Sequence, residues 1–350
     1  MIGAAIASQE WQRIWERWFS CHHALRHPVV LAVVIGAIVL SVVAGVVIQL
    51  LRWSGRVTPD LYRDLYLRWR SWMVIAVLIL TPILLGAAWT MLAVVLLSLT
   101  CYYEFARATG LRGEVALNTV VVCGIGLLTF AVVDHYDRLF FAAAALTVVA
   151  LAVVTISSDR PQGYVQRVAL AICGFLLFGY SLGYLGNLAN IGDLGNGTDY
   201  RALMVTVILG TALNDICAYC VGKVIGGRKL LPHTSPGKTI AGSVGALLVA
   251  GPLVALLFHA VLYGTPADRW PILLTLGMGI SVFGQLGDLV LSSIKRDVGI
   301  KDLGTAIPGH GGFLDRFDSL ILVGPAVYHY LSFHLGPLAA SEPARIFSGG

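Results

Sequence analysis

Long apolar segments are the feature that most constrains how this chain can fold. Residues Val29 to Leu51 form an uninterrupted apolar run, and roughly 20 such residues suffice to cross a bilayer as a helix. The stretch 73–103 is too long for one crossing and is interrupted near Pro82 to Gly86, so it is predicted to form two short helices joined by a tight turn. Further apolar segments lie at 115–133, 139–156, 168–188, 203–225, 240–262, 272–292 and 320–335. The prediction is an all-α, polytopic integral membrane bundle of about ten transmembrane helices.

The composition agrees with a membrane protein. Hydrophobic residues make up 57% of the 350 and charged residues only 12%, whereas soluble domains carry about 25% charged residues. The net charge of +5 needs no nucleic acid to explain it, because membrane proteins gather Lys and Arg in cytoplasmic loops. Cys217 and Cys220 have a metal-like or redox-like spacing, but no second pair accompanies them. They are interpreted as buried thiols on a helix.

The first 70 residues differ from the rest. No short apolar core ending in a cleavage site is apparent in the first 28 residues. Trp11, Ile14, Trp15 and Trp18 recur at helical spacing, which predicts a short amphipathic helix at the membrane interface; a disordered or partner-bound tail is the alternative. We therefore divide the chain into residues 1–70, holding an N-terminal interfacial segment, an extra transmembrane helix and an Arg-rich loop, and a membrane domain at 71–350 with the active site in 203–318.

The placement of lysine and arginine predicts the orientation. The loop after the first span and those around Arg107, Arg160, 228–238 and 295–316 fall on one side and hold most of the positive charge. The loops at 134–138, 190–200 and 263–270 fall opposite and are acidic or mixed. The prediction is a protein of the cell inner (plasma) membrane with its active site facing the cytoplasm and its Arg-bearing N-terminus outside.

Residues 292–318 form the densest polar segment. Its cations are Lys295, Arg296, Lys301 and Arg316, and its carboxylates include Asp302, Asp315 and Asp318. His310 stands among Gly309, Gly311 and Gly312, where the backbone can approach a ligand closely. Cations for phosphates and carboxylates for a divalent metal are what phosphoryl or nucleotidyl transfer requires. A solvated loop between membrane helices is the alternative.

Acidic residues also lie inside apolar segments. Asp215 and Asp288 each stand in a predicted span, where an ionised carboxylate costs about 2.5–3.5 kcal/mol on insertion scales and is expected to have a partner or a metal. A structural polar pair is the alternative for Asp215. Asp288, Ser292 and Lys295 recur at four- and three-residue spacing, so they share one helix face that leads into residues 292–318.

Gly237-Lys238-Thr239 has the ending of a P-loop, but the position of that motif's earlier glycine is Pro232 and a helix precedes it. We therefore reject a P-loop. Ser235 to Thr239 is instead predicted to open the next helix, where free N–H groups and Lys238 make a phosphate site.

Part of the chain resembles a known family. The pattern Ser-x-Ile-Lys-Arg, four residues, then Lys-Asp-x-Gly-x-x-Ile-Pro-x-His-Gly-Gly-Phe-x-Asp-Arg-Phe-Asp resembles the signature of the phosphatidate cytidylyltransferases (CDP-diacylglycerol synthases) at every fixed position. The resemblance covers roughly the C-terminal half, and in the N-terminal half only Tyr103-Glu104-Phe105. Around Lys238 the chain resembles the family element Ser-Pro-Lys-Lys-Thr-x-Glu-Gly, with Gly237 replacing a Lys and Ala241 replacing the Glu.

The resemblance implies transfer of a cytidylyl group from CTP to phosphatidate, giving CDP-diacylglycerol and pyrophosphate in phospholipid biosynthesis. It implies Mg²⁺ on Asp288 and Asp315, with Asp318 a weaker candidate. His310 would contact a phosphate or help the attacking group, or else pin the glycine turn. The implied catalytic set is Asp288, Lys295, Arg296, His310 and Asp315. The implied substrate-binding set is Asp215, Ser235, Lys238, Thr239, Lys301, Asp302, Gly311, Gly312 and Arg316.

Three alternatives remain open at this point. The first is a paralogue that uses another lipid phosphate or nucleotide, and the second is an inactive family member; Ala241 supports both. The third is a non-catalytic transporter or scaffold, since the chain has about ten predicted spans with intramembrane acids. The predicted partners are CTP and bilayer phosphatidate, without nucleic acid, and a homodimer is compatible with the resemblance.

Overall fold

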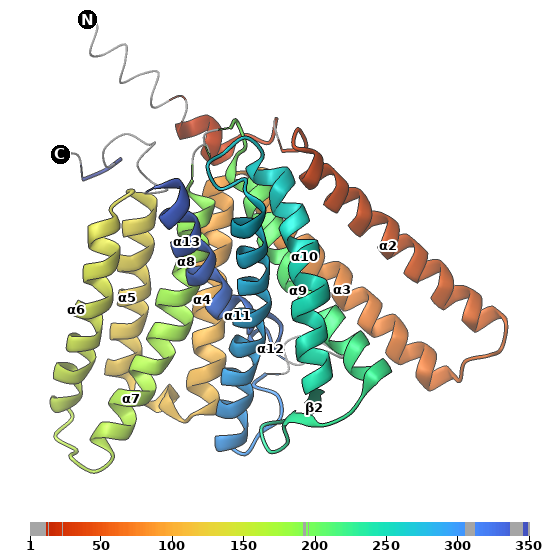
Figure 1. Ribbon diagram of the computed structural model, residues 1–350. Coiled ribbons are helices and arrows are strands. Elements are labelled where there is room, and N and C mark those ends of the chain that lie inside the picture. Colours follow the sequence, from red (N-terminus) through yellow and green to blue (C-terminus); the bar gives the residue numbers. More distant parts are fainter. Residues whose placement is uncertain are drawn as a thin grey trace, which may run out of the picture.

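The computed structural model describes residues 12, 14–22, 24–191, 194, 196–304, 312–336 and 346–348. Within them the protein is a bundle of roughly parallel and antiparallel helices (Figure 1). Nine of these helical segments are long and apolar enough to cross a membrane, which confirms the predicted all-α polytopic fold. They are α2 (Pro28–Trp53), α3 (Pro59–Leu85), α4 (Ala87–Ala108), α5 (Val115–Val133), α6 (Asp137–Ile156), the continuous α7 (Tyr164–Gly174), η2 (Phe175–Ser181) and α8 (Leu182–Ala189), α9 (Tyr200–Ile225), α10 (Ile240–Leu262) and α11 (Trp270–Asp297).

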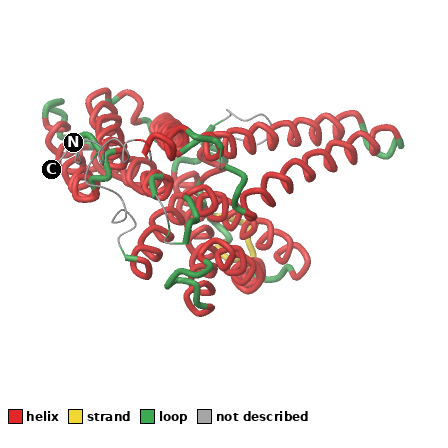
Figure 2. The backbone as a smooth tube through the Cα atoms, turned by 90° about the horizontal axis from the view of Figure 1, so that it is seen from above, coloured by secondary structure: helices red, strands yellow, loops and turns green. Residues whose placement is uncertain are grey.

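The first two helices project from the bundle as an arm. Figure 2 shows α2 and α3 running side by side away from the other helices. Helix α3 begins at Pro59, after Thr58 accepts a hydrogen bond from the Leu61 amide at 3.3 Å, so proline and a threonine cap set its start. The predicted Arg-rich loop is therefore wrong for residues 59–70, which are helical, and α3 is not the short helix that was predicted.

The predicted break near Pro82 to Gly86 is confirmed, and the N-terminal segment explains its geometry. Gly86 has φ +144° and separates α3 from α4. A Cβ on Gly86 would lie 2.0 Å from the Trp18 carbonyl oxygen, so only glycine fits there. Residues 14–19 are helical, and Ile14 and Trp18 are buried against the bundle whereas Trp15 is 64% exposed. The prediction that Trp15 shares a face with them is wrong, and Trp11 lies outside the described residues.

A β-hairpin interrupts the helices after α9. Strands β1 (Lys229–Leu231) and β2 (Ser235–Thr239) pair antiparallel, with Lys229 opposite Thr239. The prediction that Ser235 to Thr239 opens the next helix is wrong: α10 begins at Ile240, and Thr239 caps it by accepting a hydrogen bond from the Gly242 amide at 3.0 Å. The loops after α4, α6 and α11 lie at the same end of the bundle as this hairpin (Figure 1), and each carries lysine or arginine.

The end of the chain returns into the bundle. Helix α11 ends near the hairpin, whereas the single turn α12 (Leu314–Phe317) lies about half-way along the bundle and leads into α13 (Leu320–Leu335). The residues around α12 are thereby placed beside α9, α11 and α4 rather than in an outer loop.

Candidate active site

One cavity of about 1290 Å³ brings the polar residues of the sequence together. Its walls come from α2, α3, α9, α10, α11, the β-hairpin and the segment around α12. One part of its lining is polar and charged, and another is apolar. The lining includes nine of the predicted site residues, namely Asp215, Lys238, Thr239, Asp288, Lys295, Asp302, Asp315, Arg316 and Asp318.

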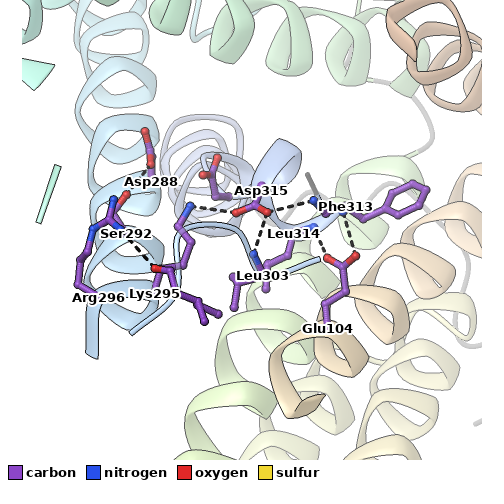
Figure 3. A network of polar contacts seen from close by, with 12 residues as sticks. Glu104, Asp288, Ser292, Lys295, Arg296, Leu303, Phe313, Leu314 and Asp315 are labelled. Carbon is purple, nitrogen blue, oxygen red and sulfur yellow. Dashed lines mark hydrogen bonds and ion pairs between the residues drawn. The ribbon is translucent and has the colours of Figure 1, made fainter. Parts of the chain in front are cut away.

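Asp315 organises the loop that precedes it. Its Oδ1 accepts a hydrogen bond from Lys295 Nζ at 2.9 Å, and its Oδ2 accepts from the amides of Leu303 at 3.0 Å and Gly312 at 3.1 Å (Figure 3). The Asp315 side chain is only 4% exposed and that of Lys295 12%. A buried pair with three donors on one carboxylate fixes both ends of the loop to α11.

Glu104 on α4 holds the same loop from the other side. Its two carboxylate oxygens accept hydrogen bonds from the amides of Phe313 at 3.1 Å and Leu314 at 2.8 Å (Figure 3). The glycines at 304 and 312 pack so closely that a Cβ on either would lie within 2.4 to 2.6 Å of this carboxylate. No role was predicted for Glu104 from the sequence, although it stands in the short N-terminal stretch that resembles the family.

We expect Glu104→Gln to lower both stability and turnover. A glutamine keeps one acceptor but turns its NH₂ toward the second amide, and an unsatisfied buried donor costs about 1–3 kcal/mol. Because Leu314 directly precedes Asp315, the shift would also disturb the site. Thermal unfolding and turnover of Glu104→Gln and of Glu16→Gln, a matched change at an exposed acid, test this. Equal behaviour of the two variants would contradict the role given to Glu104.

Asp288 faces the cavity from α11. Its Oδ2 forms an ion pair with Lys238 Nζ on β2 at 2.5 Å, and its Oδ1 accepts a hydrogen bond from Ser292 at 3.1 Å. The pair is about one-quarter exposed, at 25% for the Lys238 side chain and 28% for that of Asp288. The hairpin and α11 therefore place a cation and a carboxylate in contact at the edge of the cavity.

Asp215 and Asp318 add two further carboxylates. Ser319 connects them, since its hydroxyl lies 3.5 Å from Asp215 Oδ2 and 3.4 Å from Asp318 Oδ1. Behind them, Asn214 accepts a hydrogen bond from Ser281 at 2.7 Å and another from Gln285 at 3.4 Å. This amide and hydroxyl network fixes α9 against α11, and Asn214 and Ser319 had no assigned role in the sequence analysis.

Burial raises the pKa of Asp318 to about 8, and the carboxylates of Asp288 and Asp215 add to the shift while Lys295 opposes it. From pH near 4 to pH near 8 the folded state then holds a proton that the unfolded chain has released, so stability falls as the pH rises through this window. We expect the metal-free protein to unfold at a lower temperature at pH 8 than at pH 5, and Asp318→Asn to reduce that difference. Thermal unfolding at both pH values measures it, and identical pH profiles would contradict the assignment.

The acidic residues fit a divalent cation that is shared with a substrate. No three acidic, histidine or cysteine side chains in the described part of the chain form a ready-made metal cage. Mg²⁺, however, usually takes only one or two protein carboxylates and fills its shell with water and substrate phosphate oxygens. Asp288 and Asp318 offer such oxygens in the same cavity. Asp315 could bind the cation only if it lost at least one of the three hydrogen bonds that it accepts.

The other predicted site residues lie elsewhere. Among the described residues that line the cavity, Ser235, Arg296 and Lys301 do not appear. Arg296 instead donates to the carbonyl oxygens of Thr234 and Ile300, each at 3.3 Å, and so ties the hairpin to the loop after α11. Gly312 donates to Asp315. His310 and Gly311 lie outside the described residues.

Comparison with known proteins gives a family match and several relatives. A family model described as "Cytidylyltransferase family" matches residues 66–334. The Escherichia coli K12 protein named "Uncharacterized protein YnbB" is 30% identical over 279 residues, which cover 77% of this chain and 88% of the relative.

The relatives that carry a functional name include two phosphatidate cytidylyltransferases. The phosphatidate cytidylyltransferase of Bacillus subtilis 168 is 38% identical over 194 residues, covering 55% of this chain and 66% of the relative. That of Staphylococcus aureus COL is 47% identical over 113 residues, covering 32% of this chain and 42% of the relative. The chain therefore belongs to the cytidylyltransferase family, together with the phosphatidate cytidylyltransferases, and is a membrane-embedded nucleotidyltransferase.

Proposed function

We propose that this protein transfers the cytidylyl group of CTP to phosphatidate and forms CDP-diacylglycerol and pyrophosphate for phospholipid biosynthesis. The observation that carries the proposal is the cavity of about 1290 Å³, in which lysines and carboxylates adjoin an apolar wall. A nucleoside triphosphate needs the charged part, and a lipid phosphate needs both parts. The names of the relatives from Bacillus and Staphylococcus support the same reaction.

In the proposed reaction, a phosphate oxygen of phosphatidate attacks the α-phosphorus of CTP. The bond from the α-phosphorus to the oxygen that bridges to the β-phosphorus breaks, and that oxygen leaves with pyrophosphate. No covalent nucleophile of the protein is required, so positioning and charge neutralisation carry the step.

Of the five described cationic residues that line the cavity, three belong to the set that the family resemblance implies. Lys238 and Lys295 each pair with a carboxylate, at 2.5 Å and 2.9 Å, so both are held in defined positions. Arg316 lines the same cavity. We assign these residues to the triphosphate and to the lipid phosphate. A contact between His310 and a phosphate stays a prediction, because His310 lies outside the described residues.

Asp288 and Asp318 would hold Mg²⁺, which supplies neutralisation of triphosphate charge when it is bound. Asp215 stands beside Asp318 through Ser319 and adds to the negative charge of the cavity. Asp315, whose oxygens both accept hydrogen bonds, acts chiefly by holding Lys295 and the loop.

The orientation is part of the proposal. The loops after α4, α6 and α11, which carry lysine or arginine, lie at the same end of the bundle as the β-hairpin (Figure 1), and lysine and arginine favour the cytoplasmic side. We place this end in the cytoplasm of a cell whose inner (plasma) membrane holds the protein, because CTP is a cytoplasmic substrate.

An assay with two labels tests the proposed reaction. Purified full-length protein receives phosphatidate, Mg²⁺ and CTP labelled either at the α- or at the γ-phosphorus. The expected result is lipid-soluble label from α-labelled CTP only, and labelled pyrophosphate from γ-labelled CTP. The phosphatidate cytidylyltransferase of Bacillus subtilis is the positive control. If the control labels the lipid fraction from α-labelled CTP and this protein does not, the proposal is overturned.

The competing function is nucleotidyl transfer with another lipid phosphate in place of phosphatidate, or with another nucleotide in place of CTP. Ala241, which replaces the family glutamate, is the second residue of α10 and is half-buried. The same assay with a polyprenyl phosphate, and with each of the other nucleoside triphosphates, separates the two functions. Higher kcat/KM with one of these than with phosphatidate and CTP would favour the alternative.

A further inference from the structure

We infer that α2 and α3 form, together with α9, an apolar chamber for the acyl chains of the lipid substrate, and that α2 limits the size of the chains the protein accepts. That the ligand is the lipid substrate rests on the proposed function. That there is an apolar chamber is argued from the residues that line the cavity. Helix α2 (Pro28–Trp53) precedes residues 66–334, which match the family model, so the family match does not include this wall.

A continuous face of α9 runs along the cavity, from its charged part to its apolar part. The residues that line it recur every three or four positions, as expected for one side of a helix. In the part nearer the β-hairpin they include Asp215 and Lys223. In the other part they are Val205, Ile208, Leu209, Thr211 and Ala212, all apolar except Thr211, whose hydroxyl donates a hydrogen bond to a carbonyl oxygen of its own helix. The charged site and the apolar chamber thus share one helix and join without a break.

Helix α3 supplies the opposite wall of the chamber. Ile75, Ala76, Ile79 and Ile83 line the cavity and recur at helical spacing. Each is apolar, and Ile75 and Ile83 are only 5% and 2% exposed. Helix α2 closes the chamber with its own apolar residues, Val33 and Ala37. Between these walls a polar ligand would lose its hydration without compensation, whereas a hydrocarbon chain would be favoured.

The dimensions suit an acyl chain that is attached to a headgroup at the charged site. From Asp215 to Val205 the α9 axis covers about 15 Å at 1.5 Å per residue, which is about half the hydrocarbon thickness of a bilayer. A lipid of the leaflet on the β-hairpin side has its headgroup toward that end and its chains toward the middle. The charged part and the apolar chamber follow in the same order.

The arm leaves a way in from the side. Figure 1 shows α2 and α3 running away from α9 toward the hairpin end, and Figure 2 shows the arm projecting from the bundle. The most apolar window of α2 has none of its residues buried within the protein, so the outer side of α2 faces the bilayer. A lipid can therefore reach the chamber without leaving the bilayer.

Two small residues of the chamber offer a direct test. Ala37→Trp and Ala76→Trp would each fill part of the chamber from a different helix. Ala32→Trp is the matched control, because Ala32 is an exposed alanine of α2 and is not among the cavity-lining residues that the structure describes. Turnover is measured for the full-length protein with dioleoyl phosphatidate and with dihexanoyl phosphatidate.

We expect each chamber variant to lower kcat/KM for the dioleoyl lipid about tenfold or more, since one misfitted methylene already costs about tenfold. The kcat/KM for the dihexanoyl lipid and the KM for CTP are expected to stay nearly unchanged. Ala32→Trp is expected to match the wild type with both lipids. Equal losses for both lipids, or no loss for either, in both Ala37→Trp and Ala76→Trp would overturn the chamber.

A binding readout separates this inference from the proposed function. Phosphatidate with a diazirine near the end of one acyl chain is irradiated with the protein, and the labelled peptides are identified by mass spectrometry. The expected labels lie on α2, α3 and the Val205 half of α9, and Ala37→Trp reduces them. If the wild type shows this labelling but no cytidylyl transfer, only the proposed function fails. If it transfers cytidylyl groups but carries its labels elsewhere, only the chamber fails.

Discussion

Asp288→Asn is expected to reduce CTP-dependent turnover about a thousandfold, the size of effect seen when one preorganised electrostatic group is removed from a transition state. Asp288 lines the cavity and pairs with Lys238. The amide keeps the shape of the side chain but removes the charge that would hold both the lysine and a divalent cation. Turnover at saturating CTP and phosphatidate measures the loss.

The matched control for this change is Asp297→Asn. Asp297 is the last residue of the same helix and is exposed. We expect it to retain wild-type turnover, and we expect both variants to unfold near the wild-type temperature, because the Asp288–Lys238 pair is partly open to solvent. An Asp288→Asn protein that is folded and fully active would remove Asp288 from the site.

Asp315→Asn is expected to destabilise the protein by about 3–5 kcal/mol, the cost of breaking a buried ion pair by removing one partner. The Lys295 ammonium would lose its carboxylate while 12% exposed, and the loop would lose its fixed contacts to the amides of Leu303 and Gly312. Turnover should fall with stability, since Lys295 is then free to move. Thermal unfolding in detergent gives the first effect, and turnover below the unfolding temperature gives the second.

A double-mutant cycle separates the ion pair from the backbone contacts. Lys295→Met removes the cation alone, and the Asp315→Asn/Lys295→Met double variant removes both charges. The double variant should be less destabilised than the sum of the two single variants, because it leaves no uncompensated buried charge. Strict additivity would show that Asp315 and Lys295 act independently.

Most of the helical fold could be predicted from the sequence because apolar runs directly report which segments cross a membrane. The start of α3 could not be predicted from hydropathy, since its first turns carry charge; Thr58 and Pro59 were the available signal. The β-hairpin was missed because two strands of three and five residues leave too short a pattern. Trp15 has helical spacing, but spacing does not tell which side meets the bundle.

In the candidate site, contacts between residues close in the sequence could be predicted, whereas contacts between distant segments could not. Asp288 and Lys295 share a helix face, so local spacing sufficed to place them together. Glu104 contacts residues 209 and 210 positions away, and no spacing rule connects segments so distant. Lys238 was predicted at a helix start, whereas it lies on β2 and contacts Asp288. Only the folded chain shows that contact.

Binding of Mn²⁺ tests most directly the claim that the carboxylates of this cavity and a nucleoside triphosphate share a divalent cation. Electron paramagnetic resonance of the purified protein reports free and bound Mn²⁺ with and without CTP. The account predicts tight binding that requires CTP in the wild type and in Asp297→Asn, and its loss in Asp288→Asn. Binding of equal affinity in Asp288→Asn, or CTP-dependent binding to none of these proteins, would contradict it.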